Sequence, residues 1–117
     1  MKTFKNMAAQ GDFIILRITS LPENIEPFTE IDDGKYVIAH SETGHNHVMV
    51  MDRVKAYKPS GVESKDIFEL YLSVEDPTTI EHLRSFDTHE ALQVPAGNYV
   101  VKRQREYVPE GFRKAAD

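Results

Sequence analysis

The sequence predicts a mainly β fold, either a small single-domain β-barrel or a jelly-roll-like sandwich with little helix. Proline and glycine interrupt the 117-residue chain at short intervals, and such residues mark turns. The segments between them are short and rich in valine, isoleucine and tyrosine, which favour strands. Almost no segment shows the apolar spacing of an amphipathic helix. Roughly seven or eight evenly spaced strands of this kind are typical of sandwiches and barrels.

The first elements alternate between strand and loop signals. Residues 2–10 could form a short helix. Phe13–Ile18 is rich in isoleucine and is expected to be a strand. Leu21–Asp33 contains two prolines and five acidic residues, which predicts a loop or an irregular crossing. Lys35–His40 contains tyrosine, valine and isoleucine in a row, and we expect a second strand there.

The middle of the chain has the strongest strand signals. Val48–Tyr57 is expected to form two strands with a break near Asp52-Arg53. Its first part, Val48–Met51, has no polar residue between the apolar ones, which predicts a central strand or a subunit interface. In Ile67–Val74 apolar and polar residues alternate, a pattern typical of a half-buried strand. The residues expected to share its apolar face are Phe68, Leu70, Leu72 and Val74.

The last third of the chain predicts three more strands. Thr78–Leu83 and Leu92–Val94 are short, and Gly97–Val108 is the longest candidate. We expect one β-rich domain over residues 1–117, in which residues 109–117 form a helical turn or a loose C-terminal tail. Because side chains alternate along a strand, one face of the longest candidate carries Tyr99, Val101, Arg103, Arg105 and Tyr107.

Composition excludes several classes of function. The chain has no cysteine, which excludes disulfides, zinc–thiolate sites and thiol catalysis. The net charge is −5, and only residues 100–117 are basic, which argues against a nucleic-acid partner. No apolar run approaches the roughly 20 residues of a membrane helix, and the N-terminal lysines are not followed by the apolar stretch of a signal peptide. We therefore expect a soluble cytoplasmic protein without a membrane partner.

The five histidines form two clusters, at residues 40–47 and 82–89. On a strand, His45 and His47 would project from the same face. Two neighbouring imidazoles can hold a divalent metal such as Zn, Fe, Mn or Ni when a third nitrogen or a carboxylate completes the site. The candidate metal ligands are His45, His47, Asp52, His82 and His89, with Glu42, Asp87 and Glu90 as further oxygen donors.

Other interpretations of the same residues remain open. Without a metal, the imidazoles could bind a small anion or act as general acids and bases near neutral pH. Arginine could add a planar fork of donors for phosphate, but the arginines could equally lie on an exposed strand face that pairs with the acidic body. Glu26, Glu30, Asp32 and Asp33 are interpreted as a solvated acidic loop. The candidate ligand-binding residues are His40, Glu42, Arg103, Arg105 and Tyr107.

The His-x-His stretch resembles the first motif of the cupin superfamily. In that family a glutamate ligand follows the second histidine, and Asp52 stands at that spacing here. The turn of the second cupin motif resembles Pro95-Ala96-Gly97, whereas Val100 occupies the position of its histidine. The resemblance implies a metal site in a small β fold. Its ligands would be His45, His47 and Asp52, with His82 or His89 in place of the missing histidine.

A broader pattern resembles small bacterial proteins of prophages and integron-type mobile gene cassettes. It comprises residues 39–47, the segment from His82 to Tyr99, and residues 103–111. The resemblance implies one recurring unit but no particular activity.

Three function hypotheses follow. The first is a His-lined pocket that binds a divalent metal or a small anion. The alternative is a non-enzymatic binding or assembly module of a mobile element, which acts through a homodimer or a protein partner and uses Val48–Met51 or the Arg103–Tyr107 face. The third, which the acidic body disfavours, is nucleic-acid binding through the basic tail. Whether a reaction is catalysed stays open.

Overall fold

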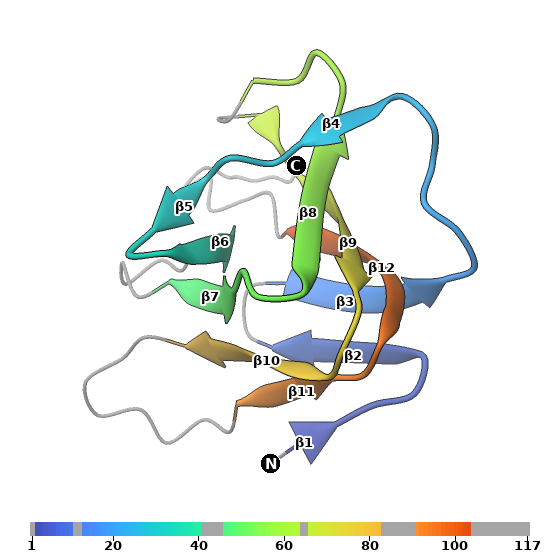
Figure 1. Cartoon of the computed structure of the whole chain (residues 1–117), viewed down its shortest axis with the longest axis vertical. Coiled ribbons are helices and arrows are strands. Elements are labelled where there is room, and N and C mark those ends of the chain that lie inside the picture. Colours follow the sequence, from blue (N-terminus) through green and yellow to red (C-terminus); the bar gives the residue numbers. More distant parts are fainter. Residues whose placement is uncertain (1, 11–12, 41–45, 64–65, 83–90, 104–117) are drawn as a thin grey trace, which may run out of the picture.

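The computed structural model describes residues 2–10, 13–40, 46–63, 66–82 and 91–103. Within these ranges the chain forms twelve strands in two six-stranded sheets, which we call sheet A and sheet B. The mainly β prediction is confirmed, and the arrangement is sandwich-like rather than a closed barrel (Figure 1). The described residues contain no helix long and apolar enough to span a membrane.

Sheet A has the strand order β1-β11-β10-β7-β6-β5. All its neighbours are antiparallel except β1 and β11, which are parallel. In Figure 1, β5, β6 and β7 lie on the left, and β1, β10 and β11 lie below them. The strands are β1 (Lys2–Thr3), β5 (Ile31–Asp32), β6 (Lys35–Ala39), β7 (His47–Val50), β10 (Thr78–His82) and β11 (Leu92–Val94).

Sheet B has the order β2-β3-β12-β9-β8-β4, and all its neighbours are antiparallel. The strands are β2 (Met7–Gln10), β3 (Phe13–Ile18), β4 (Ile25–Pro27), β8 (Val54–Pro59), β9 (Glu69–Val74) and β12 (Gly97–Arg103). Between β1 and β2, β4 and β5, β7 and β8, β9 and β10, and β11 and β12 the chain changes sheet. Among the described strands neither sheet closes on itself, and this distinguishes the fold from a barrel.

The core fills the space between the two sheets. Alternation along β9 buries Leu70, Leu72 and Val74 while Tyr71 and Ser73 stay half-buried on the other face, which confirms the predicted period of two. The same alternation on the other strands gives one continuous apolar layer. Sheet B contributes Phe13, Ile15, Val54, Ala56, Tyr99 and Val101, and sheet A contributes Tyr36, Ile38, Met49, Ile80, Leu92 and Val94.

One local prediction was wrong and another was incomplete. Residues 2–10 contain β1 and β2 instead of a helix, because β2 pairs with β3 and follows the two-residue alternation of a strand, with Ala8 buried between exposed neighbours. Leu21–Asp33 crosses from sheet B to sheet A, but it also contains two short strands, since β4 pairs with β8 and β5 pairs with β6. The prediction for Phe13–Ile18 is confirmed to the residue.

The apolar run at Val48–Met51 has a structural explanation. β7 lies between β10 and β6 in sheet A, and Val48 and Met49 are buried. Of the two alternatives, the central strand is confirmed. Only Val50 and Met51 remain exposed.

An inward-facing arginine closes one end of the sandwich, at the start of β12. Arg17 donates from Nε to the Lys5 carbonyl at 2.8 Å and from Nη1 to the Ala96 carbonyl at 3.1 Å. Its guanidinium lies 5.0 Å from the centre of the Tyr99 ring. A Cβ atom at Gly97, where φ is +149°, would overlap this guanidinium. The turn therefore needs glycine both for its backbone and for the space above it.

Candidate functional site

A second inward-facing arginine, Arg103, lies at the opposite end of β12. It shares the inner face of the strand with Tyr99 and Val101, and only 10% of its side chain is exposed. The expectation of an exposed strand face is therefore wrong for Arg103. Burial lowers the pKa of Arg103, and the neighbouring Glu30 carboxylate opposes that shift. The guanidinium also lies 5.5 Å from the centre of the Phe28 ring, a distance suited to a cation–π contact.

The Arg103 guanidinium joins the two sheets. Nε donates to the Ile38 carbonyl at 2.9 Å, and Nη2 donates to the Val37 carbonyl at 2.9 Å. These acceptors belong to β6 of sheet A. On the sheet B side, Nη1 donates to the Ile67 carbonyl at 3.3 Å. Because Nη2 also donates to Glu30 Oε1 at 3.1 Å, four contacts occupy the donors of this side chain, and few are left for an added ligand.

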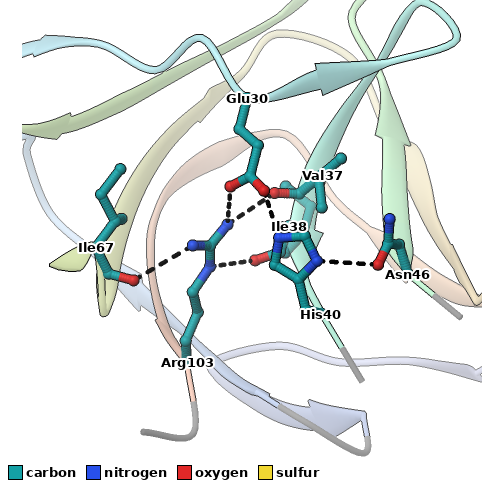
Figure 2. Close-up of polar contacts among 7 residues, drawn as sticks. All are labelled: Glu30, Val37, Ile38, His40, Asn46, Ile67 and Arg103. Atoms are coloured by element: carbon teal, nitrogen blue, oxygen red, sulfur yellow. Dashed lines mark hydrogen bonds and ion pairs between the residues drawn. The ribbon is translucent and has the colours of Figure 1, made fainter. Parts of the chain in front are cut away.

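Glu30 lies between Arg103 and His40 (Figure 2). One carboxylate oxygen, Oε1, accepts from Arg103, and the other, Oε2, accepts from Nε2 of His40. An ionised carboxylate only accepts hydrogen bonds, so Nε2 of His40 must carry the proton. The buried arginine thus fixes the carboxylate, and the carboxylate fixes the tautomer and the orientation of the imidazole.

The second ring nitrogen of His40 points toward Asn46. Nδ1 of His40 and Oδ1 of Asn46 are 3.1 Å apart. His40 follows the last residue of β6 and Asn46 precedes the first residue of β7, and these strands are antiparallel neighbours. The pairing therefore brings the two side chains together at one end of sheet A. The His40 side chain is 56% exposed, so solvent and solutes can reach this end of the network.

The other described candidates lie apart from this network. His47 is 1% exposed, and its ring packs edge-on against Phe13 with centroids 5.2 Å apart. Its register partner across the sheet is His82 of β10. Asp52 is exposed and lies past the opposite end of β7 from His47, so at least the length of that strand, about 10 Å, separates the two residues.

The remaining predicted site residues lie outside the described part of the chain. Among the residues that are described, no three histidine, aspartate or glutamate side chains converge so that they could hold a metal ion. The candidates outside the described ranges are Glu42, His45, Asp87, His89, Glu90, Arg105 and Tyr107.

Two members of the network were missed by sequence reasoning. Glu30 was assigned to a solvated acidic loop, but it bonds Arg103 and His40, and Glu26 of the same loop pairs with Lys58. Asn46 was not singled out at all. No local pattern could have revealed Glu30, because it meets a residue 73 positions away. The only signal near Asn46 was the histidine-rich stretch around it.

A shallow hollow of about 320 Å³ lies at the start of β8. Its charged lining is mixed, and Arg53 already pairs with Asp76. This hollow therefore lacks the single-sign lining that would favour one class of ligand. Its lining residues are Met51, Arg53, Val54, Lys55, Ser73 and Glu75.

Comparison with known proteins places the network inside a defined family. The family described as a domain of unknown function, DUF8820, matches residues 9–104. The chain belongs to this family. The matched range includes Glu30, His40, Asn46 and Arg103, so the whole network lies within the family domain. Neither a curated protein nor a solved structure matches the chain.

Proposed function

We propose that this DUF8820 domain binds a divalent transition metal ion through Nδ1 of His40. The observation that supports the proposal is the Glu30 carboxylate, which accepts the Nε2 proton of His40 and is itself bonded to Arg103. In metal proteins, a ligating histidine commonly donates its other ring proton to a carboxylate, which orients the ring and raises its basicity. Arg103 and Glu30 are positioning residues in this proposal.

The occupied donors and acceptors favour a metal over an anion. Both oxygens of Glu30 are engaged, so this residue orients the imidazole and does not ligate. Arg103 is engaged by three carbonyls as well as by Glu30, so it offers little to a phosphate. Nδ1 of His40 lies 3.1 Å from the amide oxygen of Asn46, so a metal ion bound at Nδ1 would replace this contact and would have the amide oxygen within reach.

The donor types suit borderline divalent ions. Imidazole nitrogen binds Zn, Fe and Ni, and amide or carboxylate oxygen also suits Mn. His40 and Asn46 would provide two donors. The sequence between them contains Glu42 and His45, which we propose as further ligands, and water completes the coordination.

The proposal is tested by isothermal titration calorimetry of the tag-free chain with Zn²⁺, Ni²⁺, Fe²⁺ and Mn²⁺. We expect near-stoichiometric binding of at least one ion. His40→Ala should abolish it, and Glu30→Gln should weaken it by about 10- to 100-fold, which is the usual effect of losing an orienting partner. Glu26→Gln is the matched control, because Glu26 is an acid of the same loop that bonds Lys58 instead. Circular dichroism verifies that each variant is folded.

Two results would overturn the proposal. One is the absence of binding for all four ions. The other is unchanged binding in folded His40→Ala together with loss of binding in His45→Ala. That result would assign the metal site to His45 and leave Glu30 without a role in it.

A further inference from the structure

We infer that the outer face of sheet B is a homodimer interface, on evidence independent of the metal proposal. A single apolar row crosses five strands of this sheet. Its members are direct register partners: Met7 pairs with Leu16, Leu16 with Val100, Val100 with Tyr71, and Tyr71 with Tyr57. We call these five residues the apolar row.

The apolar row faces away from the core. Each member alternates with an inward neighbour on its strand, and the inward residues Ala8, Ile15, Tyr99, Leu72 and Ala56 belong to the core cluster between the sheets, whereas the members of the row do not. Val100, at the centre of the row, is only 8% exposed, and Leu16, Tyr71 and Tyr57 are half-buried. Met7 is 63% exposed, and Ile14 beside the row is 44% exposed. The solvated face of an antiparallel sheet is normally polar. An apolar row across such a face therefore indicates a contact surface.

Polar residues flank the apolar row on β12, β9 and β8, whereas the flanking positions on β3 are Ile14 and Ile18, the register partners of Lys102 and Asn98. On one side, Lys102 pairs in register with Glu69, and their charged atoms are 3.9 Å apart. On the other side, Asn98 pairs with Ser73, and Ser73 pairs with Lys55. This is the arrangement of an interface with an apolar centre and a polar rim.

A second copy of this chain fits the surface. The two-fold axis would run parallel to the strands, over the boundary between β12 and β9 at the centre of sheet B. Rotation about this axis places the strands of the partner's sheet B over those of the first subunit in reverse order. It places Val100 against Tyr71 of the partner subunit and Leu16 against Tyr57 of the partner subunit, so that each aliphatic residue meets an aromatic one. Face-to-face packing of two twisted sheets at a small angle is a common arrangement.

The same axis also places opposite charges against one another across the interface. It brings Lys102 opposite the partner's Glu69, and by symmetry the contact occurs twice, as in every isologous interface. The two intrachain pairs then form one set of four alternating charges. Opposite charges that face one another across a rim favour the correct partner and register.

The experiment measures molar mass by light scattering after size-exclusion chromatography and by sedimentation. We expect the parent chain at twice its 13.4 kDa monomer mass. Leu16→Lys should give a folded monomer, because Leu16 lies on the outer face and leaves the core intact. The matched control is Gln93→Lys, an exposed position on sheet A, and it should remain a dimer.

Charge reversal tests the proposed axis. Lys102→Glu makes the rim all acidic and Glu69→Lys makes it all basic, so each variant alone should be monomeric at low ionic strength. Mixed in equal amounts they should form a heterodimer, because both cross-subunit contacts become attractive. A monomeric parent chain would overturn the inference. So would a dimer that persists in Leu16→Lys, or two charge variants that stay monomeric when mixed.

Discussion

Arg103 and Glu30 are 73 residues apart in the sequence and form an ion pair between the sheets, where Nη2 of Arg103 lies 3.1 Å from Oε1 of Glu30. The pair joins the last strand of sheet B to the segment that enters sheet A. Because Glu30 also accepts from His40, a buried contact that holds the sheets together also sets the orientation of an exposed imidazole. Stability and the proposed metal site thus depend on the same two side chains.

Arg103→Met should destabilise the fold strongly. It leaves Oε1 of Glu30 and three carbonyls without the Arg103 donors in a mostly buried place, and breaking such a pair costs about 3–5 kcal/mol. Urea denaturation measures the loss. Arg53→Met is the control, since Arg53 pairs with Asp76 at the surface, where an ion pair contributes little to stability. Equal losses in the two variants would contradict the central role of Arg103.

Gly97→Ala should destabilise the turn between β11 and β12. The new methyl group would overlap the Arg17 guanidinium, and φ is +149°, so about 1–3 kcal/mol of strain or displaced contacts is expected. Gly34→Ala is the comparison, because Gly34 also has positive φ, +75°, but nothing lies within 4 Å of its added Cβ. Thermal melts should show the larger decrease in Tm for Gly97→Ala. A smaller decrease than for Gly34→Ala would argue against the packing of Arg17 over this turn.

His47→Ala and His40→Ala should differ sharply in stability. His47 is fully buried against Phe13, and truncating a large core side chain costs about 2–5 kcal/mol. His40 is 56% exposed, and a surface substitution usually changes stability by about 0.5 kcal/mol or less. Chemical denaturation of both variants separates the structural histidine from the one proposed to bind metal. Similar losses would remove that distinction.

Stability should decline in acid partly through Glu26. A hydrogen bond from Lys58 lowers the pKa of Glu26 below its ordinary value of 4.5, and the charge of Lys58 acts in the same direction. A carboxyl group with a lowered folded-state pKa stabilises the fold above its unfolded pKa. That contribution is lost as the pH falls through the folded value. Urea midpoints from pH 7 down to below 4.5 should therefore fall more steeply for the parent than for Glu26→Gln. Parallel curves would show that the Lys58 contact adds nothing.

The sequence predicted the fold class because strand alternation is a local property. Leu70, Leu72 and Val74 alternate in the sequence and are buried in the structure. The short edge strands could not be predicted this way. β1 has two residues and pairs in parallel with β11, about 90 positions later in the chain. A strand this short forms because it pairs with β11, and the strand propensity of its own two residues does not predict it.

The candidate site was predictable only in part. His40 and Arg103 were both expected to bind a ligand, but the inward direction of Arg103 follows from the sandwich and not from its own strand pattern. Glu30 and Asn46 joined the network through strand pairing, which brings together loops from different parts of the chain. The predictions at His45 and His89 lie outside the described residues.

The most direct test of the metal proposal is a nitrogen NMR spectrum of the histidine side chains, recorded before and after addition of Zn²⁺. The account predicts that His40 carries its proton on Nε2 without metal and keeps it when metal is added, while the Nδ1 resonance shifts. A His40 spectrum that does not change with saturating metal, or loss of the Nε2 proton when metal is added, would contradict it.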